Sequence, residues 1–391
     1  MKFSSLTGRI GGTGADAWLT HYEAADARAR GEDVIVLSVG DPDIDTPAPV
    51  LERAIEQLRR GDTHYVQAAG RPALRQAIAR SHEARTAQAV QAANVVYLAG
   101  AQNALFAASL CLAGPGDEVL TFEPMYPTYP ATIEVSGARL VRAPADRSLR
   151  PDLEALPALI TPRTRMILWA SPNNPSGFVM SEAELAVIGE LAQRHDLWLV
   201  VDEVYAGLAP GGRVPGLAAR LPERVVTLGS LSKSHAMTGW RAGWLVGPLE
   251  LAKKVELLAM CMLFGLPGFV QEAAITALAV AAEAEQRTRD YCHACRQRFA
   301  AGLRGIPQLR LIEPEAGMFM LIDVSGTGLS GAGFVRALYA AQKVSVLDGA
   351  AFGGSTAACV RVCFATDAAS IDEACARIRS FCAAELSDSR T

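Results

Sequence analysis

Long apolar runs and clusters of positive charge are both missing from this sequence. Apolar stretches such as AAITALAVAA are much shorter than the roughly 20 residues that cross a membrane. There are 37 Lys and Arg against 41 Asp and Glu, and no run of Lys and Arg stands out, so the basic surface of a nucleic-acid binder is not expected. The start, MKFSSLTGRIGGTG, has no apolar core of the kind that a signal peptide needs. We therefore expect a cytoplasmic protein with neither a membrane nor a nucleic acid as its partner.

Closely spaced cysteines are also scarce. Eight cysteines are scattered along the chain, and the one tight pair, Cys292 and Cys295, lies in a helical pattern with no second pair to complete a zinc site. We expect reduced thiols and no metal. What the chain does have is length, because 391 residues, 50% of them hydrophobic, can bury a core large enough for two domains. Small-molecule chemistry is then the function class that composition favours.

Short apolar runs alternate, in the main, with helical stretches between residues 95 and 246. The runs are VVYLAG, EVLTF, ARLVRA, RMILWAS, LWLVVDE, RVVTLGS and GWLVG. This alternation predicts an α/β fold with a largely parallel sheet that helices cover on both faces. Ser181 and Glu184 have the spacing of a capping box, which predicts that the segment after them is a helix crossing between two neighbouring strands.

The flanking segments extend this pattern. Residues 46–60 have the apolar spacing of an amphipathic helix with Pro47 near its first turn, and residues 249–302 are expected to be almost wholly helical. Strand and helix patterns then start again with MFMLIDV, FVRALYAAQ, VSVLD and CVRVCF. The expected regions are an N-terminal arm and part of the small domain over 1–45, a large domain over 46–285, and a small C-terminal domain over 286–391.

Polar residues follow three of the apolar runs, at the sheet edge where open parallel sheets bind ligands. They are Asn174 after the first of these runs, Asp202 and Tyr205 after the second, and Ser230, Ser232, Lys233 and Arg241 after the third. Because the carboxyl ends of parallel strands meet at one edge, we expect these side chains to share a site.

A lysine at such an edge indicates covalent chemistry. A nearby positive charge such as Arg241 disfavours the ammonium form of Lys233, and the neutral amine forms imines. Asp202 is costly to bury alone, but a carboxylate is what a pyridinium nitrogen requires as its partner. Arg241 and the two serines can hold a phosphate with the backbone N–H groups of Ala101 and Gln102, where GAQNALFAASL turns from strand into helix.

The segments SLSKSHAMTGWRAGW, SPNNPSG, VDEVYAGL and CVRVCFA resemble the active-site segments of class I/II aminotransferases, which are pyridoxal-phosphate enzymes of fold type I. The likeness extends over nearly the whole chain. It implies a large domain with a mostly parallel seven-stranded sheet, a smaller α+β domain, and the transfer of an amino group between an amino acid and a 2-oxo acid.

The resemblance also assigns roles to the matching positions. For the cofactor, it implies that Lys233 is the Schiff-base lysine, that Asp202 is the partner of the pyridine nitrogen, and that Tyr126 stacks on the ring. Asn174 and Tyr205 would donate to the phenolic oxygen, Ser230 and Arg241 would bind the phosphate, and Tyr65 would contact the phosphate of the neighbouring subunit. For the substrate, Arg361 would clamp the α-carboxylate, with Gly40 and Asn174 beside that carboxylate. A site shared in this way implies a homodimer.

The run SVGDPDIDTPAP, taken with SLSKSHAMTGWRAGW, resembles in particular those family members that pass the α-amino group of arginine to pyruvate. A pocket for arginine is expected to offer a carboxylate to the distal guanidinium. Asp16 and Glu23 on the N-terminal arm are the candidates for that charge.

Other interpretations of the same residues lead to different functions. Ser230 and Lys233 match a serine β-lactamase motif, but the remaining motifs are in the wrong order. Residues 326–331, GTGLSG, imitate a dinucleotide fingerprint, yet too little chain follows, so a tight turn is expected. A pyridoxal-phosphate C–S β-lyase would use the same lysine, aspartate and arginine. The cofactor-binding half of a transcription regulator would need a helix-turn-helix, for which we find no pattern before residue 40.

Overall fold

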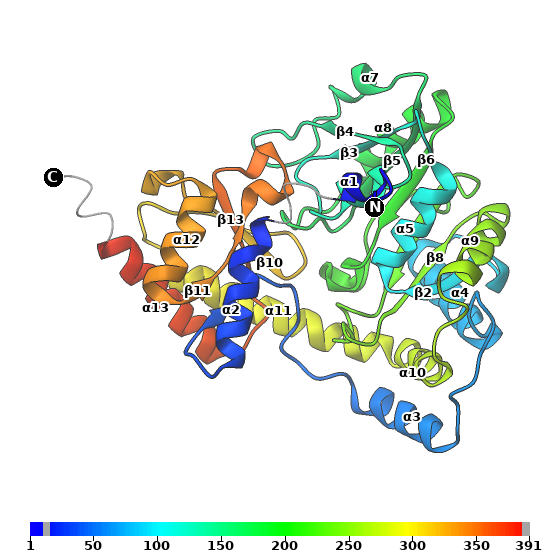
Figure 1. The fold of residues 1–391 in the computed structure, drawn as a ribbon, viewed down its shortest axis with the longest axis horizontal. Coiled ribbons are helices and arrows are strands. Elements are labelled where there is room, and N and C mark those ends of the chain that lie inside the picture. Colours follow the sequence, from blue (N-terminus) through cyan, green and yellow to red (C-terminus); the bar gives the residue numbers. More distant parts are fainter. Residues whose placement is uncertain (11–15, 385–391) are drawn as a thin grey trace.

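A seven-stranded, mostly parallel sheet lies at the centre of the computed structural model, which describes residues 1–10 and 16–384 (Figure 1). In their order across the sheet the strands are β2 (Val95–Ala99), β8 (Ala242–Val246), β7 (Val225–Ser230), β6 (Trp198–Asp202), β5 (Thr164–Ala170), β3 (Glu118–Phe122) and β4 (Arg139–Ala143). Only β8 runs antiparallel to its neighbours. The seven strands predicted from the apolar runs are therefore confirmed, as is the largely parallel sheet.

Helices bury both faces of this sheet, because successive side chains of each strand point to opposite sides. On β2, Val96 and Leu98 pack with α5 and α9, whereas Val95 and Tyr97 pack on the other side with α3, α4 and α10. The helices of this part are α3 (Ala48–Arg59), α4 (Pro72–Thr86), α5 (Ala101–Leu112), α6 (Tyr129–Glu134), α7 (Leu156–Leu159), α8 (Glu182–Arg194), α9 (Leu249–Met262) and α10 (Gly268–Ala279). Short 3-10 turns are η1 (Asp16–Trp18), η2 (Ala92–Asn94), η3 (Ala206–Leu208) and η4 (Pro210–Gly212).

The predicted capping box begins helix α8. The hydroxyl of Ser181 accepts a hydrogen bond from the backbone N–H of Glu184 at 3.2 Å, and the Glu184 carboxylate accepts one from the backbone N–H of Ser181 at 2.7 Å. Helix α8 connects β5 to β6, which lie side by side and parallel. The predicted crossover is confirmed, and it brings the carboxyl ends of both strands to one edge of the sheet.

The amphipathic helix expected over 46–60 is present as α3, which begins just after Pro47. Its buried apolar residues are Val50 and Ala54, whereas Leu51 and Leu58 remain 48% and 44% exposed. The apolar face of α3 is therefore wider than the part of it that the rest of the chain buries.

A second group of elements packs beside the large sheet, around a four-stranded antiparallel sheet (Figure 1). Its strands, in sheet order, are β12 (Leu347–Asp348), β13 (Cys359–Cys363), β10 (Phe319–Asp323) and β9 (Arg310–Ile312). Its remaining elements are α11 (Ala281–Leu303), η5 (Ser325–Thr327), α12 (Gly331–Gln342), η6 (Gly349–Phe352), η7 (Gly354–Thr356) and α13 (Ala368–Ala384). The three-residue strand β9 was not predicted, because RLI is too short to show a period.

The N-terminal segment is divided between the two groups: its first helix packs against α6, and the rest lies against the second group. It contains α1 (Thr7–Ile10) and α2 (Leu19–Ala29), and its strand β1 (Ile35–Val36) pairs in parallel with β11 (Val344–Ser345). The long helix α11 runs from beside α10 to the smaller sheet (Figure 1). The domain boundary expected after residue 285 falls inside α11, and the division into three regions stays a prediction.

The described part of the chain bears on the expected membrane spans, on the cysteines and on the glycine-rich residues 326–331. None of the described helices is long and apolar enough to cross a membrane. The cysteines are free thiols, and Cys292 and Cys295 lie buried on α11. Residues 326–331 form the end of η5 and a turn into α12, which agrees with the tight turn expected there.

Candidate active site

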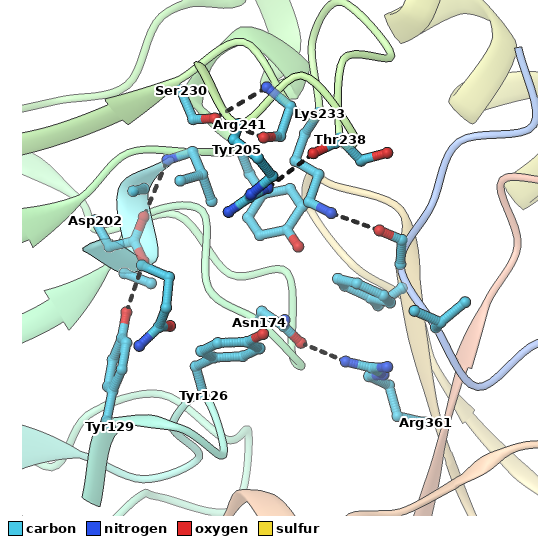
Figure 2. Close-up of a pocket in the computed structure, with 18 of the residues that line it drawn as sticks. Tyr126, Tyr129, Asn174, Asp202, Tyr205, Ser230, Lys233, Thr238, Arg241 and Arg361 are labelled. Carbon is cyan, nitrogen blue, oxygen red and sulfur yellow. Dashed lines mark hydrogen bonds between the residues drawn. The ribbon is translucent and has the colours of Figure 1, made fainter. Parts of the chain in front are cut away.

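A cavity opens where the carboxyl ends of β5, β6 and β7 meet the smaller sheet and the N-terminal segment (Figure 2). It encloses about 870 Å³ of empty space, including solvent at its mouth. The predicted site residues that line it are Gly40, Ala101, Gln102, Tyr126, Asn174, Asp202, Tyr205, Ser230, Ser232, Lys233, Arg241 and Arg361. Residues from strand ends far apart in the sequence are thus brought together.

Tyr65 is the one predicted site residue outside this lining. Its side chain is 84% exposed, and its ring makes an edge contact with Phe264 at a centroid distance of 4.9 Å. Its predicted role toward a neighbouring subunit stays a prediction.

Lys233 follows β7 and faces the cavity with its amine. Its Nζ donates a hydrogen bond to the carbonyl oxygen of Gly40. Burial lowers the pKa of Lys233, and the positive charges of Arg361 and Arg241 act in the same direction. A larger share of the amine is therefore neutral and nucleophilic than for an exposed lysine.

Gly40 itself is required by the packing around this contact. A Cβ at this position would lie 2.4 Å from Cζ of Phe319, so a side chain there would displace either the ring or the backbone. The close approach keeps the Gly40 carbonyl next to the lysine.

Asp202 ends β6, between β5 and β7 in the sheet. Its carboxylate accepts hydrogen bonds from the Tyr129 hydroxyl at 3.0 Å and from the backbone N–H of Val204 at 3.2 Å. Burial nevertheless raises the pKa of Asp202 to about 6, although these hydrogen bonds and the charge of Lys233 oppose the shift. A cationic ligand next to this carboxylate would restore its ionised form.

Hydrogen-bond donors converge at the N-terminus of α5. Gly100 caps the helix with φ +85°, and a Cβ there would lie 2.4 Å from Nη2 of Arg241, so only glycine lets the guanidinium approach the helix end. Ser230 and Ser232 lie beside it and are joined by a hydrogen bond of 2.7 Å between their hydroxyls. The helix N-terminus, the guanidinium and the hydroxyls together suit a phosphate.

Arg361 on β13 is a buried guanidinium, only 1% exposed. Its Nη1 donates to Oδ1 of Asn174 at 3.1 Å and its Nη2 donates to the carbonyl oxygen of Ser38, while Nε has no hydrogen-bond partner. Among the described residues no carboxylate forms an ion pair with it. A buried cation without an acidic partner is suited to bind the carboxylate of a ligand.

Aromatic side chains complete the walls (Figure 2). Tyr126 packs edge-on to Tyr129 with ring centroids 5.9 Å apart, and Tyr205 packs in the same way on Phe319 at 5.7 Å. Burial raises the pKa values of the Tyr126 and Tyr205 hydroxyls, so both remain protonated hydrogen-bond donors at neutral pH.

Seven further lining residues were missed from the sequence: Trp18, Val39, Tyr129, Ala170, Val204, Thr238 and Phe319. Thr238 could have been found, because it stands between Lys233 and Arg241 in the same loop. Trp18 and Phe319 carry no local signal, since they come from the N-terminal segment and the smaller sheet. Of the two predicted carboxylates on the arm, Glu23 is exposed and outside the lining, and the side chain of Asp16 lies outside the described part of the chain.

A family model for aminotransferase class I and II matches residues 32–378. The chain belongs to this family. It is 47% identical to the arginine–pyruvate transaminase of Pseudomonas aeruginosa, with 99% of both chains covered, and 33% identical to an aspartate aminotransferase of Musicola paradisiaca, with 86% of both covered. The aspartate aminotransferase of Thermus thermophilus with maleate is a similar solved structure, with a TM-score of 0.92, 28% identity, and coverage of 97% of this chain and 100% of the other. The chain is thus an aminotransferase with a fold type I architecture.

Membership of this family implies pyridoxal phosphate, and the cavity fits that group. The lysine with a lowered pKa, the partly buried carboxylate, and the donors at the start of α5 match an aldehyde, a ring nitrogen and a phosphate respectively.

The raised pKa of Asp202 predicts a pH-dependent stability for protein freed of any cofactor. The folded chain holds a proton on Asp202 up to about pH 6, whereas the unfolded chain loses it near pH 4. The free energy of unfolding should therefore fall by up to about 3 kcal/mol as pH rises from about 4 to 6. In Asp202→Asn this part of the pH dependence should disappear, as measured by denaturant unfolding across that range. The control Asp26→Asn, at an exposed position on α2, should keep it, and an unchanged slope in Asp202→Asn would contradict the assignment.

Proposed function

We propose that this aminotransferase passes the α-amino group of arginine to pyruvate, using pyridoxal phosphate held covalently by Lys233. One observation carries the proposal: a partly buried lysine, a partly buried carboxylate and an unpaired buried arginine, Lys233, Asp202 and Arg361, face one cavity. The similarity of the whole chain to an arginine–pyruvate transaminase supports these two substrates.

Bound pyridoxal phosphate supplies an aldehyde that accepts the amino group and a ring that withdraws electrons from the substrate α-carbon. On the protein side, Asp202 keeps the ring nitrogen protonated, and Asn174 and Tyr205 donate to the phenolic oxygen. Tyr126 covers the ring. Ala101, Gln102, Ser230, Ser232 and Arg241 bind the phosphate through the converging donors at the start of α5.

The substrate is oriented by its α-carboxylate. In the proposed role, Arg361 binds that carboxylate, and its Nε lacks a hydrogen-bond partner in the described chain, while Asn174 and Gly40 line the same cavity. Lys233, once its Nζ is free, removes the proton from the substrate α-carbon as a general base. Its lowered pKa supports this role, because a neutral amine is required.

Replacing the lysine tests the covalent part of the proposal. Lys233→Ala should still bind the cofactor, but borohydride should fix no adduct to the protein, and amino transfer should fall by about a thousandfold or more. Absorbance, mass spectrometry after reduction, and half-reaction rates measure the three effects. Lys253→Ala, which removes an exposed lysine on α9, should behave as wild type. Near-normal turnover of Lys233→Ala would refute the assignment.

The alternative chemistry, a C–S β-lyase, is separated by its substrates. We expect amino transfer from arginine that requires an added 2-oxo acid, with pyruvate a better acceptor than 2-oxoglutarate and arginine a better donor than leucine or aspartate. A panel of donors and acceptors measured by kcat/KM checks this order. Release of pyruvate from a cysteine conjugate without any added 2-oxo acid would favour the lyase instead.

The proposal includes a homodimer with shared sites. Several large apolar side chains are exposed near Tyr65 in the chain alone, on α9 and the loop after it: Leu257 at 63%, Met260 at 47% and Phe264 at 56%. Such a group of exposed apolar residues supports a subunit interface. In the dimer, the Tyr65 hydroxyl would bind the cofactor phosphate in its partner's site.

Sedimentation and one variant check this part. The wild type should sediment as a dimer, and Tyr65→Phe should remain a dimer while its cofactor dissociation constant rises by at least about tenfold, because a hydrogen bond to a charged group is lost. Tyr22→Phe, on the exposed face of α2, should change neither quantity. A monomer with full activity would exclude the shared site.

A cytoplasmic location is also part of the proposal. The free cysteines of the described chain support it, since disulfides are rare in that compartment. Activity recovered in the cytosolic fraction of cells would agree with this, and activity confined to membranes or medium would not.

A further inference from the structure

One residue of the cavity lining, Trp18, has no part in the function proposed above. Trp18 ends the turn η1 of the N-terminal segment and is part of the cavity lining, next to Val39 and Gly40 of the same segment. Its indole is half-buried, so one part contacts protein and another faces the cavity. The inference drawn from it rests on the proposed function, because it concerns how arginine is distinguished from other donors.

The described lining offers no free carboxylate to a guanidinium. Asp202 is its one acidic residue, and that carboxylate already accepts hydrogen bonds from Tyr129 and Val204. Asp41, nearby in the chain, accepts a hydrogen bond from Thr238 and lies outside the lining. The described side chains of this site therefore include no free carboxylate that could form the ion pair expected between the substrate arginine and the N-terminal arm.

Trp18 is held in place by contacts that lead to Arg361. Its ring packs edge-on against His21, with centroids 5.4 Å apart and planes at 82°. The Nδ1 of His21 shares a hydrogen bond of 2.8 Å with the Ser38 hydroxyl, and the Ser38 carbonyl accepts from Arg361. The indole is thus fixed relative to the guanidinium that would bind the substrate α-carboxylate.

The charge around the indole is also suitable. Burial lowers the pKa of His21, and the positive charge of Arg361 lowers it further. His21 is therefore uncharged at neutral pH and adds no repulsion toward a cationic side chain near Trp18.

The chain already holds one guanidinium with aromatic faces. Cζ of Arg361 lies 4.2 Å from the centroid of the Phe319 ring and 5.0 Å from that of Phe352. The indole of tryptophan attracts cations more strongly than phenyl rings do. An indole that lines a cavity without a free carboxylate suits a planar cation of the same kind.

We propose that Trp18 is the specificity-determining residue of this site and that its indole face binds the guanidinium of the substrate arginine by a cation–π contact. An aliphatic side chain at this position would keep the apolar contact and lose the attraction for charge. The variant should therefore lose kcat/KM selectively for amino donors with a positively charged side chain.

Citrulline provides the matched substrate, since it has the length and shape of arginine without the charge. The experiment compares kcat/KM for arginine and citrulline, with pyruvate as acceptor, in the holoenzyme and in Trp18→Leu, Trp18→Phe and Tyr22→Leu. In Trp18→Leu the arginine-to-citrulline ratio should fall by roughly 3- to 30-fold, mainly through a higher KM for arginine. Trp18→Phe should keep a larger part of the ratio. Tyr22→Leu removes an aromatic neighbour of His21 that is outside the lining, and its ratio should match wild type.

A second measurement does not depend on turnover. The competitive inhibitor 5-guanidinopentanoate, which is arginine without its amino group, should bind more weakly to Trp18→Leu by the same factor, while pentanoate should bind equally to both proteins. If Trp18→Leu does not fold, the inhibition constants of Trp18→Phe and wild type give the comparison.

An unchanged arginine-to-citrulline ratio in Trp18→Leu would overturn the proposal and would indicate a carboxylate from a neighbouring subunit or from outside the described side chains. An equal loss for arginine and citrulline would also overturn it, because that result is a loss of packing. A failure of the proposed function is distinguishable, since the wild type would then transfer no amino group from arginine at all.

Discussion

Burial of charges that are not paired with one another is the constraint on which this structure depends. Lys233, Asp202 and Arg361 all face one cavity, and burial shifts each pKa toward the uncharged form. The fold compensates only in part: Asn174 and the Ser38 carbonyl accept from Arg361, and Tyr129 donates to Asp202. Breaking a buried ion pair is costly because one charge is left alone, so a cavity built of single charges is unfavourable until ligands supply the missing partners. The folded chain is therefore less stable without ligands, and the same unpaired groups bind charged ligands more strongly.

The topology explains how these residues meet. Strands β5, β6 and β7 are adjacent and parallel, so the residues after their carboxyl ends share one edge of the sheet. Arg361 and Phe319 come from the smaller antiparallel sheet, and Gly40 and Trp18 come from the N-terminal segment. The cavity therefore requires the two groups of elements to stay in register. Hydrogen bonds such as the one from the backbone N–H of Met125 to the Phe352 carbonyl, at 2.8 Å, connect them directly beside the site.

Sequence patterns predicted the large sheet well because its central strands, such as β5, β6 and β7, are buried on both faces and have mainly apolar sequences. The same reasoning identified Asp202 and Lys233, since a charge directly after such a run is costly unless it is used. It could not place Arg361, Gly40 or Tyr126 without the resemblance to a family, because their positions depend on contacts between distant segments. Trp18 and Phe319 were missed for that reason, and β9 was missed because three residues show no period. The apolar spacing of residues 46–60 also could not predict that Leu51 on α3 is exposed, because the spacing shows an apolar face but not how much of it the rest of the chain covers.

The charge balance of the cavity bears on how a cationic donor is accepted. Its lining has three basic side chains, Lys233, Arg241 and Arg361, and one acidic side chain, Asp202. In the proposed function each has one ligand group as its partner: the aldehyde for Lys233, the phosphate for Arg241, the α-carboxylate for Arg361 and the ring nitrogen for Asp202. An additional carboxylate placed for the guanidinium of arginine would be a second acidic group to desolvate, and it would be left without a cation whenever the substrate is absent. An aromatic face has no such effect, because its attraction for cations carries no net charge and needs no counter-ion when the site is empty. A cavity that already holds several unpaired charged groups is therefore better served by an indole than by a further acid.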